Sequence, residues 1–430
     1  MAVDTPNWVK SAIVYEVFPR NHTGNGTFAE IYRDLERIRS LHTDILWLMP
    51  IHPVGRAGRK GTLGSPYAIR DYRAIDPDLG DERSFRLLVD KAHALGMKVM
   101  LDVVYNHTSR DSVLLREHPE WFLRDASGNF TTKVPDWSDV YDLDYSRHDL
   151  WEYQIATLEK WVDLGVDGFR CDVAPLIPLD FWRAARARLA DKRELIWLAE
   201  SVEKSFVKYL RDQGYTAHSD PELHATFDLT YDYDGFEYLK EYFQGRRPLR
   251  DYLNHLHVQE TLYPAGAVKL RFLENHDNLR AAEVIRDRDS LANWTAFYAL
   301  LPGATLVYAG QEIRARNTPT LFEKDTVDWR GHVDPEFTLF MEKVLGFAKE
   351  IKSSCSRFSA TELAEGVVQL TWLGEGTVYV ALLNLANRYG EVRLDEFPEG
   401  EICLGERGRS GSYRLESMPV LMKITRHGRL

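Results

Sequence analysis

The chain has only three cysteines, and they lie far apart in the sequence. Cys171, Cys355 and Cys403 are too few and too scattered for a disulfide framework or for a zinc site built on paired thiols. This usage fits a reducing compartment, so we expect a cytoplasmic protein. No metal site is expected from the histidines either, because His107 and His276 lie on separate predicted strands without a third close partner.

Long apolar runs and basic segments are also missing. No stretch approaches the ~18 consecutive apolar residues of a membrane span, and the first residues contain no basic segment followed by an apolar one, so no secretory signal is expected. The net charge of -11 and the pI near 5.7 argue against nucleic acid or an anionic membrane as a partner. The oligomeric state is left open, and a monomer is compatible with these features.

What the sequence does contain is a repeated alternation of strand-like and helical patterns. Between the strand-like runs, apolar residues recur at helical spacing, for example from Phe85 to Leu95, where Gly96 follows at the usual cap position. Eight such alternations predict a (β/α)8 TIM barrel. The strand-like runs cover residues 12–18, 45–51, 99–105, 166–174, 195–201, 225–231, 268–274 and 304–310.

Two segments depart from this alternation. Residues 108–145 are polar, aromatic-rich and longer than one crossover needs, which predicts a short subdomain inserted after the third strand. After residue 354 the pattern changes to short apolar strands separated by Gly, Asn and charged turns. We therefore predict a catalytic barrel over 1–354 and a C-terminal all-β domain, a β-sandwich, over 355–430.

Ionisable residues stand at the carboxyl ends of several predicted strands, where a barrel of this kind has its active site. Arg170 and Asp172 are two residues apart and share one face of a strand, so the guanidinium is expected to lower the pKa of Asp172 and keep it ionised. Glu200 ends an apolar strand, where desolvation raises the pKa of a carboxyl. Taken alone, the pair of Arg170 and Asp172 is better explained as a buried ion pair, and Glu200 could equally be an exposed strand end.

Further ionisable groups lie at the ends of two other strands. Asp102 and His107 bracket the end of the third strand, and His276 with Asp277 follows the seventh. A carboxylate held ionised together with a carboxyl kept protonated is the pair that glycoside cleavage needs. Because these groups all emerge at the same end of one predicted barrel, sugar hydrolysis is the leading interpretation.

The motifs that contain these residues resemble the alpha-amylase superfamily, glycoside hydrolase family 13. DVVYNH at 102–107, GFRCDVA at 168–174, LAE at the fifth strand and ENHD at 274–277 are similar to its four principal motifs. Supporting similarities are found in GSPYAIRDY at 64–72 and in further segments along the chain. The resemblance covers essentially the whole sequence.

This resemblance implies a role for each site residue. Asp172 corresponds to the nucleophile, Glu200 to the general acid/base and Asp277 to the third carboxylate, which binds ring hydroxyls. The positions that line the subsite for the sugar under attack correspond to Tyr67, His107, Arg170 and His276. Trp137 in the inserted segment is a candidate sugar platform, with a core role equally compatible.

The resemblance has one departure that concerns metal binding. Asn106 corresponds to a calcium-ligand position, but Leu176 replaces the histidine that usually accompanies a tightly held calcium. We therefore expect no cofactor, with calcium left open.

The resemblance implies a retaining hydrolase of α-1,4-linked glucans, with an α-glucan oligosaccharide such as a maltooligosaccharide as substrate. A glucanotransferase, an α-glucosidase or a cyclomaltodextrinase would use the same carboxylates. From a different class, a non-catalytic amylase-like interaction subunit is a weaker alternative, because this chain keeps all three carboxylates.

Overall fold

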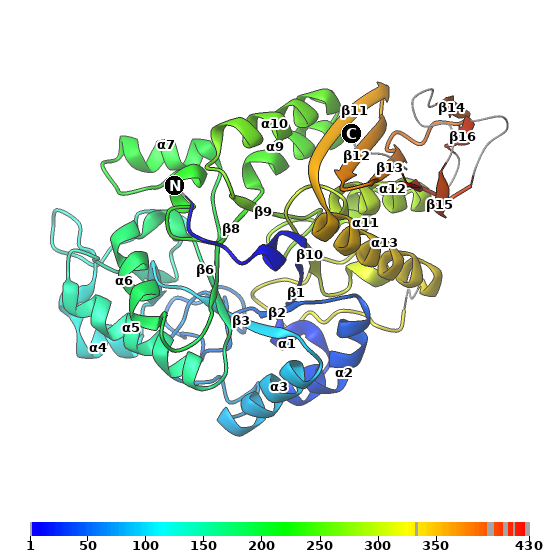
Figure 1. The fold of residues 1–430 in the computed structure, drawn as a ribbon. Helices are drawn as coiled ribbons and strands as arrows, with labels where there is room; N and C mark the ends of the chain where they lie inside the picture. The colour runs from blue at the N-terminus through cyan, green and yellow to red at the C-terminus, as the bar shows by residue number, and fades with distance from the viewer. Residues whose placement is uncertain (1, 332–333, 394–399, 407–411, 416–417, 426–430) are drawn as a thin grey trace.

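The computed structural model describes residues 2–331, 334–393, 400–406, 412–415 and 418–425. Its centre is a closed barrel of parallel strands in the order β1-β10-β9-β8-β7-β6-β3-β2 (Figure 1). All eight predicted barrel strands are confirmed. They are β1 (Ile13–Val17), β2 (Ile45–Leu48), β3 (Lys98–Val103), β6 (Gly168–Cys171), β7 (Ile196–Ala199), β8 (Leu229–Tyr231), β9 (Val268–Arg271) and β10 (Ala304–Tyr308).

The barrel strands are buried over nearly their whole length because helices cover them on the outside. The apolar side chains of these helices face the strands and form one large core with them. The helices are α1 (Pro19–His22), α2 (Phe28–Ser40), α3 (Glu82–Ala94), α4 (Val113–Glu117), α5 (His148–Asp163), α6 (Leu179–Leu189), α7 (Lys204–Asp212), α8 (Asp220–Leu223), α9 (Tyr233–Phe243), α10 (Leu249–Leu262), α11 (Ala281–Val284), α12 (Arg288–Ala299) and α13 (Pro335–Ser354).

Helix α3 shows how the local sequence sets both ends of an element. Asp81 accepts a hydrogen bond from the Ser84 backbone N–H, and the Ser84 hydroxyl accepts one from the Asp81 N–H, which satisfies two of the free donors at the helix start. Gly96 follows the helix with a φ of 76°, a conformation that other residues adopt at a cost. The predicted helix and its glycine cap are both confirmed.

The segment inserted after β3 lies beside the carboxyl end of the barrel. It contains helix α4 and a two-stranded antiparallel sheet of β4 (His107–Ser109) and β5 (Val140–Asp142). Since β4 begins only four residues after β3 ends, the insertion is held close to the barrel rim.

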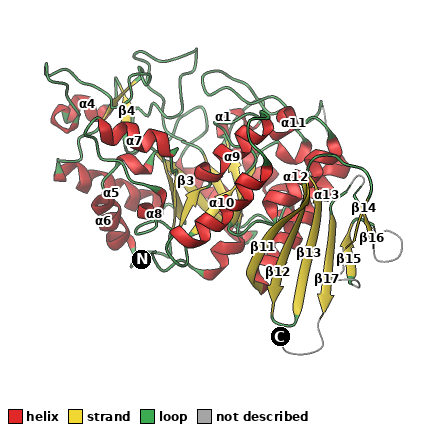
Figure 2. Cartoon of the chain, turned by 90° about the horizontal axis from the view of Figure 1, so that it is seen from above, coloured by secondary structure: helices red, strands yellow, loops and turns green. Residues whose placement is uncertain are grey.

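The C-terminal strands form an antiparallel sheet in the order β11-β12-β13-β17-β15, which Figure 2 shows beside α12 and α13. The indole N–H of Trp372 donates to the carbonyl of Leu300 at 2.8 Å, so this face of the sheet is joined to the barrel core. The strands are β11 (Cys355–Ala364), β12 (Val367–Gly374), β13 (Thr377–Asn384), β15 (Glu401–Leu404) and β17 (Val420–Thr425), with β14 (Glu391–Arg393) and β16 (Ser412–Arg414) in a separate pair. Residues 394–399, 407–411, 416–417 and 426–430 of the predicted domain lie outside the described residues.

The three cysteines are free thiols, and Cys171 is buried in the barrel. Within the described ranges, no helix is long and apolar enough to cross a bilayer.

Candidate active site

The predicted site residues meet at the carboxyl end of the barrel. Asp172 follows β6, Glu200 follows β7 and Asp277 lies shortly after β9. All three line a cavity of about 280 Å³, and Tyr67, His107 and His276 line it as well. Arg170 is fully buried beneath the cavity. The further lining residues are Lys60, Ser65, Ala68, Trp137, Asp139, Val140, Val173 and Phe322.

Arg170 connects the two carboxyls that sequence analysis assigned to chemistry. Its Nη1 donates to Asp172 Oδ1 at 2.8 Å and to Asp102 Oδ1 at 3.0 Å, while its Nη2 lies 2.8 Å from Glu200 Oε1. Asp172 and Glu200 therefore lie close together, because both contact one small guanidinium. The register of β3 and β6 pairs Asp102 with Arg170, which explains why Asp102 reaches the same group.

The two carboxyls differ in acidity. Burial raises the pKa of Asp172 to about 6 against the opposing attraction of Arg170. Burial also raises the pKa of Glu200, to about 8, and the nearby charges of Asp172 and Asp277 add to the increase. Arg170 does lower the pKa of Asp172, as expected, but desolvation outweighs the ion pair, so the pKa lies above its ordinary value. The order of the two pKa values still leaves Asp172 ionised and Glu200 protonated near pH 7.

Glu200 receives one more contact from a strained part of the backbone. The Val173 N–H donates to Glu200 Oε2 at 2.7 Å. Val173 has a φ of 36°, which a β-branched residue adopts only under strain. The turn after β6 thus orients the carboxyl that follows β7.

His276 forms the centre of a second chain of contacts. Its Nδ1 lies 2.5 Å from Glu16 Oε1, and its Nε2 lies 3.1 Å from Asp277 Oδ2 and 2.8 Å from the Tyr67 hydroxyl. Burial opposes a charge on the ring, but Asp277 and Glu16 offset it and raise the pKa of His276 well above 6.5. His276 is therefore an imidazolium that holds Asp277 as a carboxylate.

Asp277 itself faces the cavity, since its side chain is 39% exposed. Burial is the largest single influence and raises its pKa, but the charge and the hydrogen bond of His276, with contributions from Arg170 and Tyr233, together outweigh burial and lower the pKa of Asp277. Tyr67 stacks on the His276 ring at 5.4 Å between centroids, and its hydroxyl donates to Asp102. One wall of the cavity is thus an aromatic ring beside an ionised carboxylate, an arrangement that suits a sugar with its apolar face and its hydroxyls.

His107 and Trp137 form the wall on the side of the inserted segment. His107 Nε2 lies 3.9 Å from Asp172 Oδ2, and burial lowers the pKa of His107 to about 4, so its ring is neutral. The Trp137 ring is 5.1 Å from the His107 ring. Trp137 is partly buried against the apolar cluster that includes Val173 and Leu176, and it also lines the cavity. It is therefore part of the packing, and its role as a sugar platform stays a prediction.

Sequence analysis missed Glu16, Lys60 and Phe322. Glu16 is a fully buried acid within the apolar strand β1. A single acidic residue in such an apolar run could have indicated a site residue from the sequence. Lys60 and Phe322 lie on loops without periodicity. Phe322 falls in LFEKDTVDW at 321–329, a segment with a supporting similarity to the family, whereas no signal in the sequence pointed to Lys60. Their place at the cavity depends on how distant loops meet.

The position considered for calcium is occupied by a lysine. Lys133 Nζ donates to Asn106 Oδ1 at 2.7 Å and to Asp142 Oδ2 at 3.1 Å. Asp142 is fully buried. A cation at this place would need the same oxygens, so the residues present do not fit calcium while the ammonium is bound there. Among the described residues, no group of three or more His, Cys, Asp or Glu side chains could hold a metal ion.

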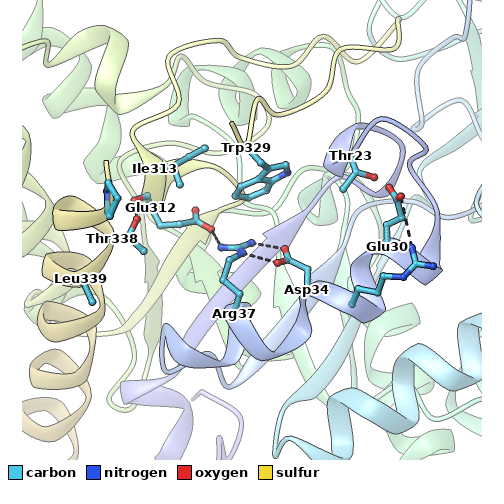
Figure 3. A pocket seen from close by; sticks show the side chains of 11 residues that line it. Thr23, Glu30, Asp34, Arg37, Glu312, Ile313, Trp329, Thr338 and Leu339 are labelled. Carbon is cyan, nitrogen blue, oxygen red and sulfur yellow. Dashed lines mark hydrogen bonds and ion pairs between the residues drawn. The ribbon is translucent and has the colours of Figure 1, made fainter. Parts of the chain in front are cut away.

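A larger hollow of about 710 Å³ lies outside the barrel, between α2 and α13 (Figure 3). Arg37 on its floor is paired with Asp34 and Glu312, and its guanidinium lies 4.4 Å from the Trp329 ring. Each nitrogen of this guanidinium already has an acceptor within the chain. None of the predicted site residues lines this hollow, so its ion pairs join α2 to the segment after β10.

Comparison with known proteins agrees with this arrangement. The family profile described as "Alpha amylase, catalytic domain" matches residues 16–121 and 114–352. An alpha-amylase from Lactobacillus plantarum is 43% identical, with 98% of this chain and 100% of that chain covered and a TM-score of 0.92. A noncanonic maltogenic alpha-amylase from Thermotoga neapolitana is 36% identical, with 98% of each chain covered and a TM-score of 0.82.

Among curated proteins, an alpha-1,4-glucan:maltose-1-phosphate maltosyltransferase from Cereibacter sphaeroides is 35% identical over 227 residues. The match covers 47% of this chain and 38% of that protein. The chain therefore spans well under half the length of this relative.

Proposed function

Because the chain belongs to the alpha-amylase family of enzymes, we propose that it is a retaining hydrolase of α-1,4-glucosidic bonds in maltooligosaccharides and related α-glucans. The observation that supports this most is the contact of Asp172 and Glu200 with one Arg170 guanidinium. Two carboxyls of unequal pKa, held close together, suit a nucleophile and an acid that act on the same bond.

In the first step Asp172 attacks the anomeric carbon while Glu200 transfers its proton to the glycosidic oxygen. The bond between that carbon and oxygen breaks, and the shortened glucan leaves as an alcohol. In the second step Glu200, now ionised, takes a proton from water, whose oxygen attacks the anomeric carbon and releases Asp172. Asp277 binds ring hydroxyls throughout, and His276 keeps it ionised.

Proton NMR of the first-formed product tests this mechanism. An α-anomer is expected from an α-glucan, whereas a β-anomer would contradict a covalent intermediate. We expect Glu200→Gln to lower kcat by about 100- to 10,000-fold through loss of the general acid, and Asp172→Asn to lower it at least as much. Glu203→Gln and Asp180→Asn are the matched controls, because these acids are 39% and 77% exposed and lie outside the cavity.

A transferase is the second candidate, supported by the similarity to the maltosyltransferase named above. It would use the same glycosyl-enzyme with a sugar hydroxyl in place of water. Incubation with maltose 1-phosphate and a maltooligosaccharide acceptor distinguishes the two. Release of phosphate with lengthening of the acceptor would favour transfer, and shortening of maltotriose, cyclodextrin, pullulan or soluble starch would favour hydrolysis.

The three free thiols support a reducing compartment, and we propose a cytoplasmic location on that basis. Soluble α-glucan oligosaccharides would be the substrates there.

A further inference from the structure

Two loops that are distant in sequence meet above the barrel on one side of the active-site cavity. The first, residues 60–64, follows β2, and the second, residues 320–323, follows β10. The Leu63 N–H donates to the Phe322 carbonyl at 3.0 Å, and the Thr62 N–H donates to Glu323 Oε1 at 2.9 Å. Since β2 and β10 are the two neighbours of β1, this loop crossing passes over the end of β1.

Arg20, which follows β1, holds the two loops from below. Its Nη2 donates to the Gly64 carbonyl at 3.0 Å and to the Leu321 carbonyl at 2.6 Å. One guanidinium group thus binds both loops of the crossing.

Gly61 shows how closely the loops approach. It has a φ of 66°, and a Cβ placed on it would lie 2.7 Å from Phe322 Cβ and 2.8 Å from the Phe322 carbonyl oxygen. Real Cβ atoms do not come this close to other atoms, so only glycine fits here. There is no room for a sugar chain between the loops at this point.

The first loop is also fixed at its other end, to the inserted segment. Lys60 Nζ donates to the Asp136 carbonyl at 2.9 Å and lies 3.5 Å from Asp139 Oδ1. Lys60, Asp139 and Phe322 all line the cavity that contains the three carboxylates. The crossing is therefore a wall of that cavity, attached on both sides.

The position of Glu200 indicates which part of a substrate meets this wall. In the closed barrel β7 lies directly opposite β1, and Glu200 follows β7. A general acid contacts the oxygen of the leaving group, so the leaving part of the glucan lies toward β7. The part that stays on Asp172, the non-reducing end, therefore points toward β1 and the loop crossing.

We infer that the loop crossing closes the non-reducing side of the cavity, so that the enzyme removes glucose or maltose from chain ends and does not cut inside a chain. This inference rests on the proposed function. A cavity of about 280 Å³ is also near the lower end of ligand sites, about 300 Å³, and has room for only a short sugar.

The test uses maltoheptaose with a fluorescent label at its reducing end, with the non-reducing end either free or blocked by a 4,6-ethylidene group. We expect the free substrate to lose one or two glucose units at a time and the blocked one to react at least 100-fold more slowly. β-Cyclodextrin, which has no ends, should stay intact. Rapid internal cleavage of the blocked substrate or of the ring would overturn the inference and leave hydrolysis standing. If no glucan is cleaved, the proposed function fails and this inference with it.

Two glycine variants test whether the crossing is the cause. Gly61→Ala pushes the loops apart, and we expect cleavage of the blocked substrate to rise at least tenfold. Gly58→Ala is the control, because its φ of 69° gives a similar backbone strain but its Cβ would meet Arg110 side-chain atoms at 3.3 and 3.4 Å and the Ser138 carbonyl oxygen at 3.7 Å, with no contact below 3.0 Å. If Gly61→Ala folds poorly, Glu323→Ala is the second variant. It removes the contact with Thr62 at a half-buried position and should change selectivity in the same direction. Unchanged selectivity in both Gly61→Ala and Glu323→Ala would overturn the assignment.

Discussion

The unequal acidity of Asp172 and Glu200 predicts a bell-shaped pH dependence of kcat/KM. Activity needs Asp172 ionised and Glu200 protonated, and burial raises their pKa values to about 6 and about 8. At pH 7 about nine molecules in ten have each group in the required form, whereas at pH 5 only about one in ten has Asp172 ionised. The rate should therefore be highest near pH 7 and fall about tenfold for each pH unit below 6 and above 8.

The assay is the initial rate of hydrolysis of 4-nitrophenyl α-maltoside between pH 4 and 10 at low substrate concentration, where kcat/KM reports the free enzyme. Nitrophenolate is a good leaving group that needs little help from an acid. Glu200→Gln should therefore keep measurable activity on this substrate and lose the alkaline fall, while the acid fall near pH 6 remains. An acid fall near pH 4 in the wild type would refute the reasoning, because it would mean that Arg170 outweighs burial at Asp172.

Three further predictions follow from buried contacts. Glu16→Gln replaces a carboxylate acceptor for His276, whose hydrogen bond is worth about 1.5 to 3 kcal/mol, by a neutral amide acceptor worth about 0.5 to 1.5 kcal/mol. The difference of about 1 to 1.5 kcal/mol predicts a fall in kcat of about 5- to 10-fold, with the alkaline fall of the pH profile at lower pH. An unchanged pH profile would contradict this positioning role. Wild-type activity and melting temperature should not respond to a chelator, and a chelator effect that calcium reverses would disprove this. Lys133→Met removes the cation beside the buried Asp142, to which the backbone N–H of residue 133 still donates, and should destabilise the fold by about 3 to 5 kcal/mol. Trp372→Phe removes the donor to the Leu300 carbonyl and should cost about 1 to 3 kcal/mol of unfolding free energy, measured by urea titration; an unchanged midpoint would show that the C-terminal sheet contributes little there.

Much of the barrel and the identity of its site residues could be read from local patterns. A strand buried on both faces is a short apolar run, and a helix that covers it repeats its apolar residues every three to four positions, so eight alternations were visible in the chain. The spacing of Arg170 and Asp172 also placed them on one face of a strand, because alternate residues of a strand point the same way. These features depend on neighbours in sequence.

The tertiary structure decided the properties that depend on groups brought together from distant segments. Glu16 and His276 are 260 positions apart, and Lys133 reaches Asn106 from the inserted segment. The pKa of Asp172 depends on how much water burial removes, and burial is set by the whole barrel. The loop crossing at Gly61 likewise exists only because β2 and β10 flank β1. The sequence therefore determined which chemical groups stand at the strand ends, whereas their charges and the shape of the cavity arise from contacts that only the folded chain makes.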